Sequence, residues 1–295
     1  MVTVIIPTYK GEDKILEAAE SVLNQTYKEI EVIIVDDNGK GSKHQIFTEN
    51  ALRPLLHKDK RLKYMVHEVN KNGSAARNTG IRNSSGEYIG FLDDDDVYLP
   101  QKIEKQVELF RSLGDEYGLI YGAFKEVIDE RHSRVVKPEN TSNFLYDFLC
   151  DRLIACSSTV LIKRSVLKDV VEWDESFRRH QDLEFFARVA YYYKVSFIED
   201  VCVEKRKMDR NTAKGFVYEE YHLHYMNKME WIIDTFSDKD KSAFYDHHYF
   251  EIGKAHIKDG NIKRALYWAL KSSNPCKMYL QYLIAAGRFA IRKIV

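Results

Sequence analysis

The sequence predicts an α/β fold in which a mostly parallel sheet is flanked by helices and followed by a helical extension. Over the first hundred residues, short apolar runs alternate with segments of helical spacing, which is the order expected of βαβ units. Polar residues follow these apolar runs directly, as they do where parallel strands end at one edge of a sheet. From Tyr218 onward only helical spacing remains. We therefore expect an α/β domain over residues 1–215 and a helical region over residues 216–295.

Each element of the α/β domain is predicted from its apolar pattern and the turn residues that bound it. Strands are expected at residues 2–6, 30–35, 62–66, 88–92, 119–122 and 201–203. Helices are expected from residue 12 or 13, over 44–57, over 73–81, over 144–151, from 164 and from 183. Residues 126–134 are expected to form a charged excursion, and residues 155–162 a further apolar stretch.

Composition excludes several classes of protein. Lys and Arg together number 45, as do Asp and Glu, so the basic excess typical of a nucleic-acid-binding protein is missing. The four cysteines have no close metal-ligand spacing and are expected to be reduced thiols of a cytosolic protein. No stretch reaches the roughly 18 apolar residues that a membrane span needs. The N-terminus is expected to be a first strand and not a signal peptide.

Four consecutive carboxylates, Asp93–Asp96, follow the apolar run Tyr88–Leu92. A buried strand that ends at these acids delivers them to the carboxyl edge of the sheet, where open α/β sheets bind ligands. Four adjacent like charges repel one another, and a hard divalent ion held by oxygen ligands would relieve that repulsion. The alternative is an acidic turn that is simply solvated.

The other polar residues at the same edge suit a nucleotide diphosphate. A paired acid such as Asp36–Asp37 can accept hydrogen bonds from a base or a ribose, and Tyr9 can stack on a base. Gly73 opens a helix that carries Arg77, so backbone N–H groups and a guanidinium are available to a diphosphate. A dinucleotide site is disfavoured, because no Gly-x-Gly-x-x-Gly or P-loop lysine motif follows the first strand.

These residues resemble those of the family 2 glycosyltransferases, which have the GT-A fold with a Rossmann-like nucleotide-binding half. The resemblance covers about residues 1–210, and four motifs carry it in the family's order: Val4–Tyr9, Val35–Asp37, Asn72–Gly80 and Phe91–Asp96. It implies an inverting transfer of a sugar from a nucleotide sugar to an acceptor hydroxyl, with Mn²⁺ or Mg²⁺. The nucleotide-binding half would then be residues 1–100, and the acceptor half residues 101–215.

Carried over by position, Tyr9 and Asp37 resemble the base-recognition pair, Asp94 the acid that reaches the ribose and donor, and Asp95 the metal ligand. Asp93 is expected on the donor side, although four acids in a row leave the register open by one residue. The full set of expected donor-binding residues is Pro7, Thr8, Tyr9, Asp37, Asn72, Gly73, Arg77, Asp93 and Asp94.

Three of these acidic and basic positions also have purely structural explanations. Asp96 could cap the helix that follows. Asp36 could be the partner of an Asx-type turn. Arg77 could form an ion pair on a helix surface.

Asp182 resembles the family's catalytic acid and lies in the first turn of the helix predicted from residue 183. An inverting transfer needs one base to take the proton of the attacking hydroxyl. The structural alternative is an ordinary acid stabilised by a helix N-terminus. Glu184 is the runner-up base, but two residues further along a helix it should point elsewhere.

Beyond residue 200 the motifs are weaker. Residues 204–215 form a basic segment that is expected either to fold over the donor phosphates or to be a solvated loop. Residues 250–255 and 259–266 resemble one helix pair of a tetratricopeptide-like repeat. The tail, residues 278–295, combines apolar and basic residues, so it could lie on an anionic membrane surface or form a dimer or core helix.

We therefore predict a metal-dependent glycosyltransferase that uses a UDP-sugar in bacterial surface polysaccharide, glycolipid or glycoprotein synthesis. Its acceptor would be a glycan or a lipid-linked or protein-linked group, and nucleic acid is not an expected partner. The expected location is the cytoplasm, with the inner face of the membrane as an open alternative. Two other functions remain open: a nucleotidyltransferase that makes sugar nucleotides, and a non-catalytic scaffold that binds them.

Overall fold

The computed structural model describes residues 1–292 except 12, 130 and 207–213, and it describes no side chain beyond residue 287. The chain divides into two compact units, Met1–Met208 and Asp209–Val295. The expected domain boundary between residues 215 and 216 stays a prediction.

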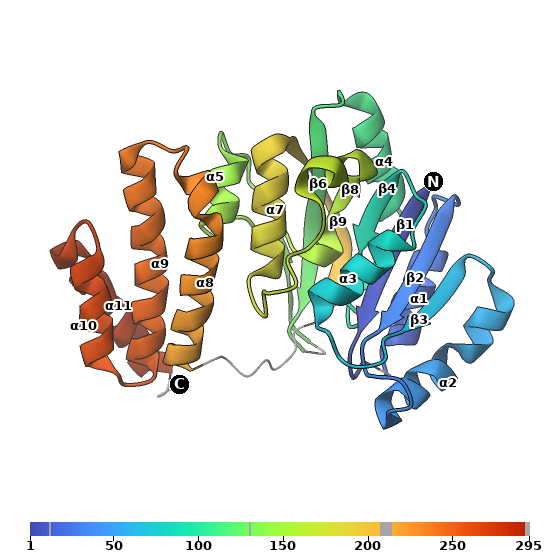
Figure 1. Cartoon of the computed structure of the whole chain (residues 1–295), viewed down its shortest axis with the longest axis horizontal. Coiled ribbons are helices and arrows are strands. Elements are labelled where there is room, and N and C mark those ends of the chain that lie inside the picture. Colours follow the sequence, from blue (N-terminus) through green and yellow to red (C-terminus); the bar gives the residue numbers. More distant parts are fainter. Residues whose placement is uncertain (12, 130, 207–213, 293–295) are drawn as a thin grey trace. The chain divides into compact units, whose positions relative to one another are not determined.

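The first unit is built on one mixed sheet (Figure 1). Over the described residues its strand order is β3-β2-β1-β4-β8-β6-β9-β5, with β7 paired to β6. The first four strands of this order are parallel, and β9 is parallel to β6, whereas β8, β7 and β5 pair antiparallel. The strands are β1 Val2–Thr8, β2 Ile30–Asp36, β3 Leu62–Val66, β4 Tyr88–Phe91, β5 Val97–Tyr98, β6 Tyr117–Val127, β7 Ser133–Val136, β8 Leu161–Lys163 and β9 Lys194–Arg206.

Helices pack on both faces of this sheet, because successive strand residues point to opposite faces. Val4 and Ile6 belong to the core cluster that also holds apolar residues of α1, α2 and α4. Ile5 faces the other way and packs on α3, where a Cβ at Gly80 would overlap its side chain. The helices of this unit are α1 Ile15–Leu23, α2 Lys43–Lys58, α3 Gly73–Arg82, α4 Lys102–Ser112, α5 Phe144–Leu149, α6 Leu167–Val170 and α7 Gln181–Tyr192, with 3₁₀ turns η1 Ser157–Thr159 and η2 Arg164–Val166.

The predicted α/β class is confirmed, and two local predictions are wrong. Residues 126–134 are not simply a charged excursion, because β6 continues to Val127 and pairs with β7, with an ion pair between Glu126 and Arg134. The last strand is also longer than expected, since β9 runs from Lys194 to Arg206. The strands were hard to recognise in the sequence because β6 and β7 form an exposed hairpin and β9 lies beside it. In such strands charged residues that form salt bridges replace the alternation of apolar and polar residues.

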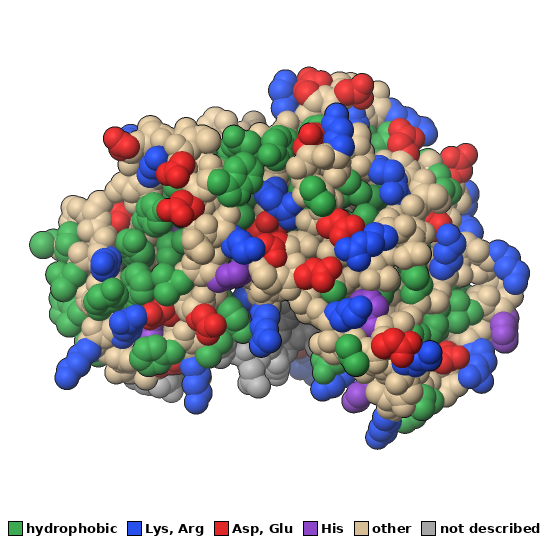
Figure 2. Space-filling view, viewed as in Figure 1, with side chains coloured by type: hydrophobic (Ala, Val, Ile, Leu, Met, Phe, Trp, Pro, Cys, Tyr) green, Lys and Arg blue, Asp and Glu red, His purple; other side chains and the backbone are tan. Residues whose placement is uncertain are grey.

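The second unit is helical, with α8 Gly215–Ile233, α9 Asp238–Lys258, α10 Ile262–Lys271 and α11 Pro275–Arg292. Buried Ala265, Ala269, Met278 and Tyr282 form one apolar cluster in it. A separate polar cluster is centred on Glu219, which accepts hydrogen bonds from Arg264, His256 and Trp268. Figure 2 shows hydrophobic side chains gathered over the helices α9–α11. Among the described helices, none is long and apolar enough to cross a membrane.

Candidate active site at the carboxyl edge of the sheet

The loops after β1 and β4 are tied together by Asp94. Its Oδ2 accepts a hydrogen bond from Thr8 Oγ1 at 2.6 Å and another from the Tyr9 backbone N–H at 3.2 Å. A Cβ at Gly11 would overlap this carboxylate, so a residue without a side chain lets the acid lie against the loop. The Tyr9 side chain is half exposed, and its ring is therefore available for stacking. Pro7 is paired with Val35 inside the sheet and lies one residue before this junction.

Asp37 organises the loop after β3 rather than projecting into open space. Its Oδ1 accepts hydrogen bonds from His67 Nδ1 at 2.7 Å and Lys71 N at 2.8 Å. Its Oδ2 accepts from Asn70 Nδ2 at 2.8 Å and Asn72 N at 2.9 Å. These four donors fill the acceptor sites of a carboxylate, so a base N–H would have to displace one of them.

The neighbouring Asp36 has a structural role. It is fully buried, accepts a hydrogen bond from the Asn38 backbone N–H at 2.9 Å, and accepts another from Tyr64 Oη at 2.6 Å. The hydrogen bond from Asn38 forms an Asx-type turn, which the sequence analysis gave as the structural explanation for Asp36.

Three carboxylates of the acidic run, Asp93–Asp96, converge. Asp93, Asp95 and Asp96 each offer an oxygen, and these oxygens lie within 4.8 Å of one another. Asp95 and Asp96 are buried, so the run is not a solvated turn. Asp96 does not cap a helix, because α4 begins at Lys102. The helix-cap alternative for Asp96 is therefore wrong.

The donor set fits a hard divalent ion. Ca²⁺, Mg²⁺ and Mn²⁺ prefer oxygen ligands, and clustered carboxylates supply them. Asp96 Oδ2 accepts a hydrogen bond from Ser158 Oγ at 2.6 Å, whereas its buried Oδ1 has no hydrogen-bond partner among the described residues. A buried carboxylate oxygen without a donor is costly, and coordination of a cation would satisfy it.

The 3₁₀ turn Ser157–Thr159 connects the acidic run to α7. Ser157 Oγ donates to Asp93 Oδ1 at 3.1 Å, while its backbone N–H donates to Asp182 Oδ2 at 3.0 Å. Ser158 Oγ, in turn, accepts from the Asp93 backbone N–H. Both serines are fully buried. Our sequence reasoning missed them because it read residues 155–162 as apolar, although three consecutive hydroxyl residues inside that stretch were the available signal.

Ser157 therefore links Asp182 to Asp93 through its two hydrogen bonds. It is the second residue of α7, whose first turn also holds Gln181. Glu184 is buried and paired with Arg188 at 2.5 Å. Arg188 also donates to the carbonyls of Val170 and Glu172. This pairing favours a structural role for Glu184 over that of the base.

Arg77 is buried and not a surface residue. Its exposed fraction is 6%, and its Nη2 donates to Asp93 Oδ1 at 2.7 Å and to Ser157 Oγ at 3.2 Å. Its Nη1 donates to Gln181 Oε1 at 3.3 Å, and the guanidinium lies 4.8 Å from the centre of the Trp173 ring. The surface ion-pair alternative is therefore wrong, and Arg77 links α3, the acidic run and α7.

Asn72 and Asn78 fix the segment that leads into α7. Asn72 caps α3 by accepting from Ala75 N at 3.1 Å, and its Nδ2 donates to the carbonyl of Glu175 at 2.9 Å. Asn78 exchanges two hydrogen bonds of 2.9 Å with the backbone of Trp173. The backbone of Gly73 approaches Arg77, since a Cβ there would lie 3.1 Å from Nη1. Sequence reasoning assigned no role to Asn78, and its place in the third motif was the available signal.

Burial raises the pKa of the site's carboxyl groups. It raises the pKa of Asp94 to about 6, against the effect of the Thr8 hydrogen bond. It raises the pKa of Asp96 to about 7, although the Lys205 ammonium at 3.6 Å acts in the opposite direction. It also raises the pKa of Asp182, opposed chiefly by Arg77. Carboxyl groups with such shifted pKa values in one cluster are typical of a functional site.

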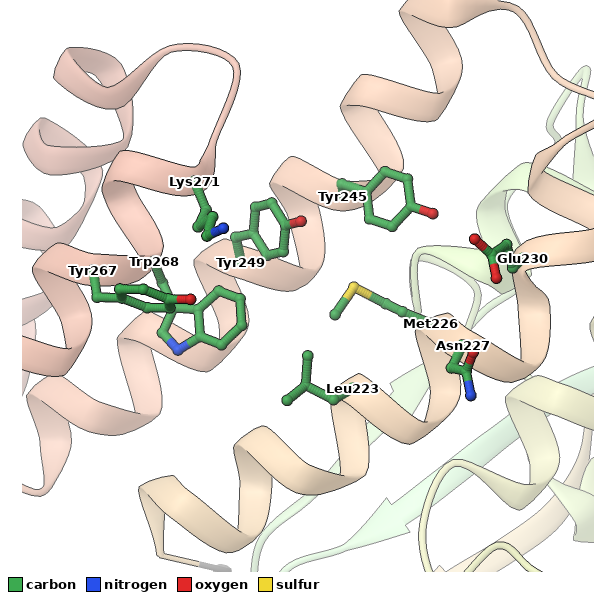
Figure 3. A pocket seen from close by; sticks show the side chains of 9 residues that line it. All are labelled: Leu223, Met226, Asn227, Glu230, Tyr245, Tyr249, Tyr267, Trp268 and Lys271. Atoms are coloured by element: carbon green, nitrogen blue, oxygen red, sulfur yellow. The ribbon is translucent and has the colours of Figure 1, made fainter.

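The second unit contains a cavity lined largely by aromatic side chains. About 330 Å³ lies between α8, α9 and α10, and Figure 3 shows Tyr245, Tyr249 and Trp268 along one side of it. The remaining lining residues are Leu223, Met226, Asn227, Glu230, Tyr267 and Lys271.

Comparison with known proteins agrees with the resemblance. Residues 3–171 match the family described as glycosyl transferase family 2. The chain belongs to this family. The predicted membership and its GT-A fold are confirmed.

This chain covers very different shares of two relatives. An uncharacterized glycosyltransferase of Rickettsia felis is 34% identical over 214 residues, which are 70% of this chain but 34% of the relative. The chain thus spans about a third of the length of that relative. The relative of Escherichia coli named UDP-Glc:alpha-D-GlcNAc-diphosphoundecaprenol beta-1,3-glucosyltransferase WfgD is 30% identical over 223 residues, covering 76% of this chain and 77% of WfgD.

Among solved structures, S. aureus TarS 1-349 in complex with UDP-GlcNAc has a TM-score of 0.61. The match covers 98% of this chain and 80% of TarS at 18% identity. At that identity the likeness shows the shared fold alone.

Proposed function

We propose that this chain is a metal-dependent, inverting glycosyltransferase that moves a sugar from a UDP-sugar to an acceptor hydroxyl. The observation that carries the proposal is the bridge through Ser157, which holds the carboxylates of Asp93 and Asp182 on two sides of one residue. A cation site and a proton acceptor so close together are what an inverting transfer requires.

The donor would bind at the carboxyl edge of the sheet. The exposed Tyr9 ring would stack on the uracil, with Pro7 and Thr8 shaping the loop. Asp37 and Asn72 would orient the base and ribose through the loop that they already organise, and Asp94 would approach the ribose. Gly73 at the start of α3 would face the diphosphate, with Arg77 beside it.

Asp95, together with Asp93 and Asp96, would hold Mn²⁺ or Mg²⁺, and the ion supplies charge neutralisation for the departing diphosphate. Asp182 would accept the proton of the attacking hydroxyl. Its raised pKa makes its carboxylate a stronger base than an exposed aspartate. The Ser157 backbone N–H holds one oxygen of Asp182 and so orients the other.

The acceptor is proposed to be a lipid-linked glycan in polysaccharide synthesis. Support comes from WfgD, whose name specifies a diphosphoundecaprenol-linked acceptor. UDP as the donor nucleotide is supported by the same name. The cytoplasmic location remains part of this proposal.

Titration of UDP into the protein with and without Mn²⁺, followed by assays of UDP-sugar hydrolysis, tests the proposal. We expect UDP binding that needs the metal and slow hydrolysis of at least one UDP-sugar. Turnover of a nucleoside triphosphate with a sugar phosphate would instead indicate a nucleotidyltransferase. Binding without turnover of any nucleotide sugar would indicate a scaffold, and no nucleotide binding at all would contradict all three.

A further inference from the structure

Helix α11 of the second unit has one face packed and one face exposed. Met278, Tyr282 and Ala285 are buried, and the Tyr282 hydroxyl donates to the carbonyl of Tyr249 at 2.7 Å. The Tyr282 ring also stacks on Phe250 at 5.7 Å. The packed face therefore fixes the orientation of α11 within its unit.

The opposite face exposes large apolar side chains. The exposed fractions are 45% for Tyr279, 58% for Leu280, 55% for Leu283 and 52% for Ile284. With about 100° between successive helix residues, these four positions share one arc of roughly 140°. Apolar side chains gathered in this way mark an interaction surface; we call the four residues Tyr279, Leu280, Leu283 and Ile284 the apolar face.

The charge of the same region is strongly one-sided. Residues 260–295 contain seven Lys or Arg and no Asp or Glu, although the whole chain has no net charge. Arg264 is paired with Glu219, whereas Lys263, Lys271 and Lys277 are exposed, and Lys277 lies two residues before Tyr279. The partner of this surface must therefore accept apolar side chains and cations together.

We propose that the apolar face of α11 docks on the surface of an anionic lipid membrane. A helix with an exposed apolar face and basic neighbours binds at the lipid interface by inserting the apolar residues, while Lys and Arg contact anionic headgroups. A second copy of this chain fits less well, because a symmetric contact brings each face against itself and so sets the basic segments of two copies side by side. The inference rests on this surface alone and not on the donor chemistry proposed above.

Vesicle flotation of the full chain tests the proposal. We expect the protein to float with vesicles of phosphatidylcholine containing 30% phosphatidylglycerol and to remain unbound with pure phosphatidylcholine. Raising the salt from about 0.1 M to 1 M, which shortens the screening length from roughly 10 Å to 3 Å, should release most of the bound protein. No binding to the anionic vesicles, or equal binding to both kinds, would overturn the proposal.

A matched pair of variants identifies the surface. Ile284→Asp should lower the vesicle-bound fraction about tenfold, since the lost insertion and the added charge both oppose binding. Ile46→Asp is the control, because Ile46 lies on α2 with a similar exposed fraction, 47%, and it should bind as the unchanged protein does. Equal binding by both variants would overturn the proposal, as would a dimer in sedimentation that Ile284→Asp dissociates without any vesicle binding. UDP-sugar hydrolysis by both variants, measured in parallel, separates this outcome from failure of the proposed enzyme activity.

Discussion

Each compact unit buries carboxylates among polar partners, but the net pKa shifts of the two sets of carboxyl groups have opposite signs. In the helical unit, burial raises the pKa of Glu219, but hydrogen bonds from Arg264, Trp268 and His256 outweigh it and bring the pKa to about 2. In the sheet unit, burial dominates at Asp94 and Asp96 and raises their pKa values to about 6 and 7.

The difference lies in how many donors face each acid. Glu219 receives a guanidinium, an indole N–H and an imidazole, so its charged form is fully stabilised and the cluster is structural. The acidic run brings three carboxylates together, and Asp96 retains an oxygen without a hydrogen bond from any described residue. A carboxylate cluster that its own fold leaves undercompensated is arranged for a ligand.

The largest effect is expected from Asp182→Asn, which tests whether the carboxylate cluster of the sheet unit is functional. The amide cannot accept the acceptor's proton, so the rate of sugar transfer should fall about 10³-fold, within the range for loss of a general base. UDP affinity should change less than about twofold, since binding does not use this proton transfer. Steady-state kinetics and calorimetry measure the two quantities. Near-normal transfer by the variant would refute Asp182 as the base.

Asp95→Ala should act on binding rather than on the chemical step. Removal of one ligand of the proposed ion should weaken Mn²⁺-dependent UDP binding by roughly 10- to 100-fold. UDP binding to Asp182→Asn in the presence of Mn²⁺, which should stay within about twofold of the unchanged protein, is the control. If the Mn²⁺ dependence survived intact, Asp95 would not be a metal ligand.

A pair of isosteric substitutions compares the two clusters directly. Glu219→Gln should lower the free energy of unfolding by about 2 kcal/mol, because it leaves the partly exposed Arg264 without its counter-charge. Asp96→Asn should change it by less than about 1 kcal/mol, since loss of the counter-charge of Lys205 is offset by removal of a buried charge whose Oδ1 has no donor among the described residues. Urea unfolding without metal measures both. A larger loss in Asp96→Asn than in Glu219→Gln would reverse our interpretation of the clusters.

The smallest effect is the pH dependence of the Glu219 cluster. Its pKa in the folded chain lies below the ordinary value of 4.5, so the unfolded chain binds a proton more readily. The stabilisation is therefore complete above about pH 4.5 and is lost as the pH falls toward about 2. The free energy of unfolding of the unchanged protein should fall more steeply over that interval than that of Glu219→Gln. Parallel slopes would show that another group titrates.

Much of the first unit could be predicted because its signals are local. The apolar runs before Asp36 and Asp93 set the strands, and Asn72 followed by Gly73 marked the start of α3, which begins at Gly73. The two serines of the 3₁₀ turn could not be identified in this way. Their role depends on contacts across 64 and 25 residues of chain, from Ser157 to Asp93 and to Asp182.

The sequence by itself determined the βα alternation, the acidic run at a strand end and the family motifs, because each is written in neighbouring residues. Only the tertiary structure decided what those residues do for one another. It paired Glu184 with Arg188, saturated Asp37 with four donors and buried Arg77 between three elements. Hydrogen-bond partners and burial arise from long-range packing, and a local sequence pattern does not indicate which distant residue will contact a given side chain.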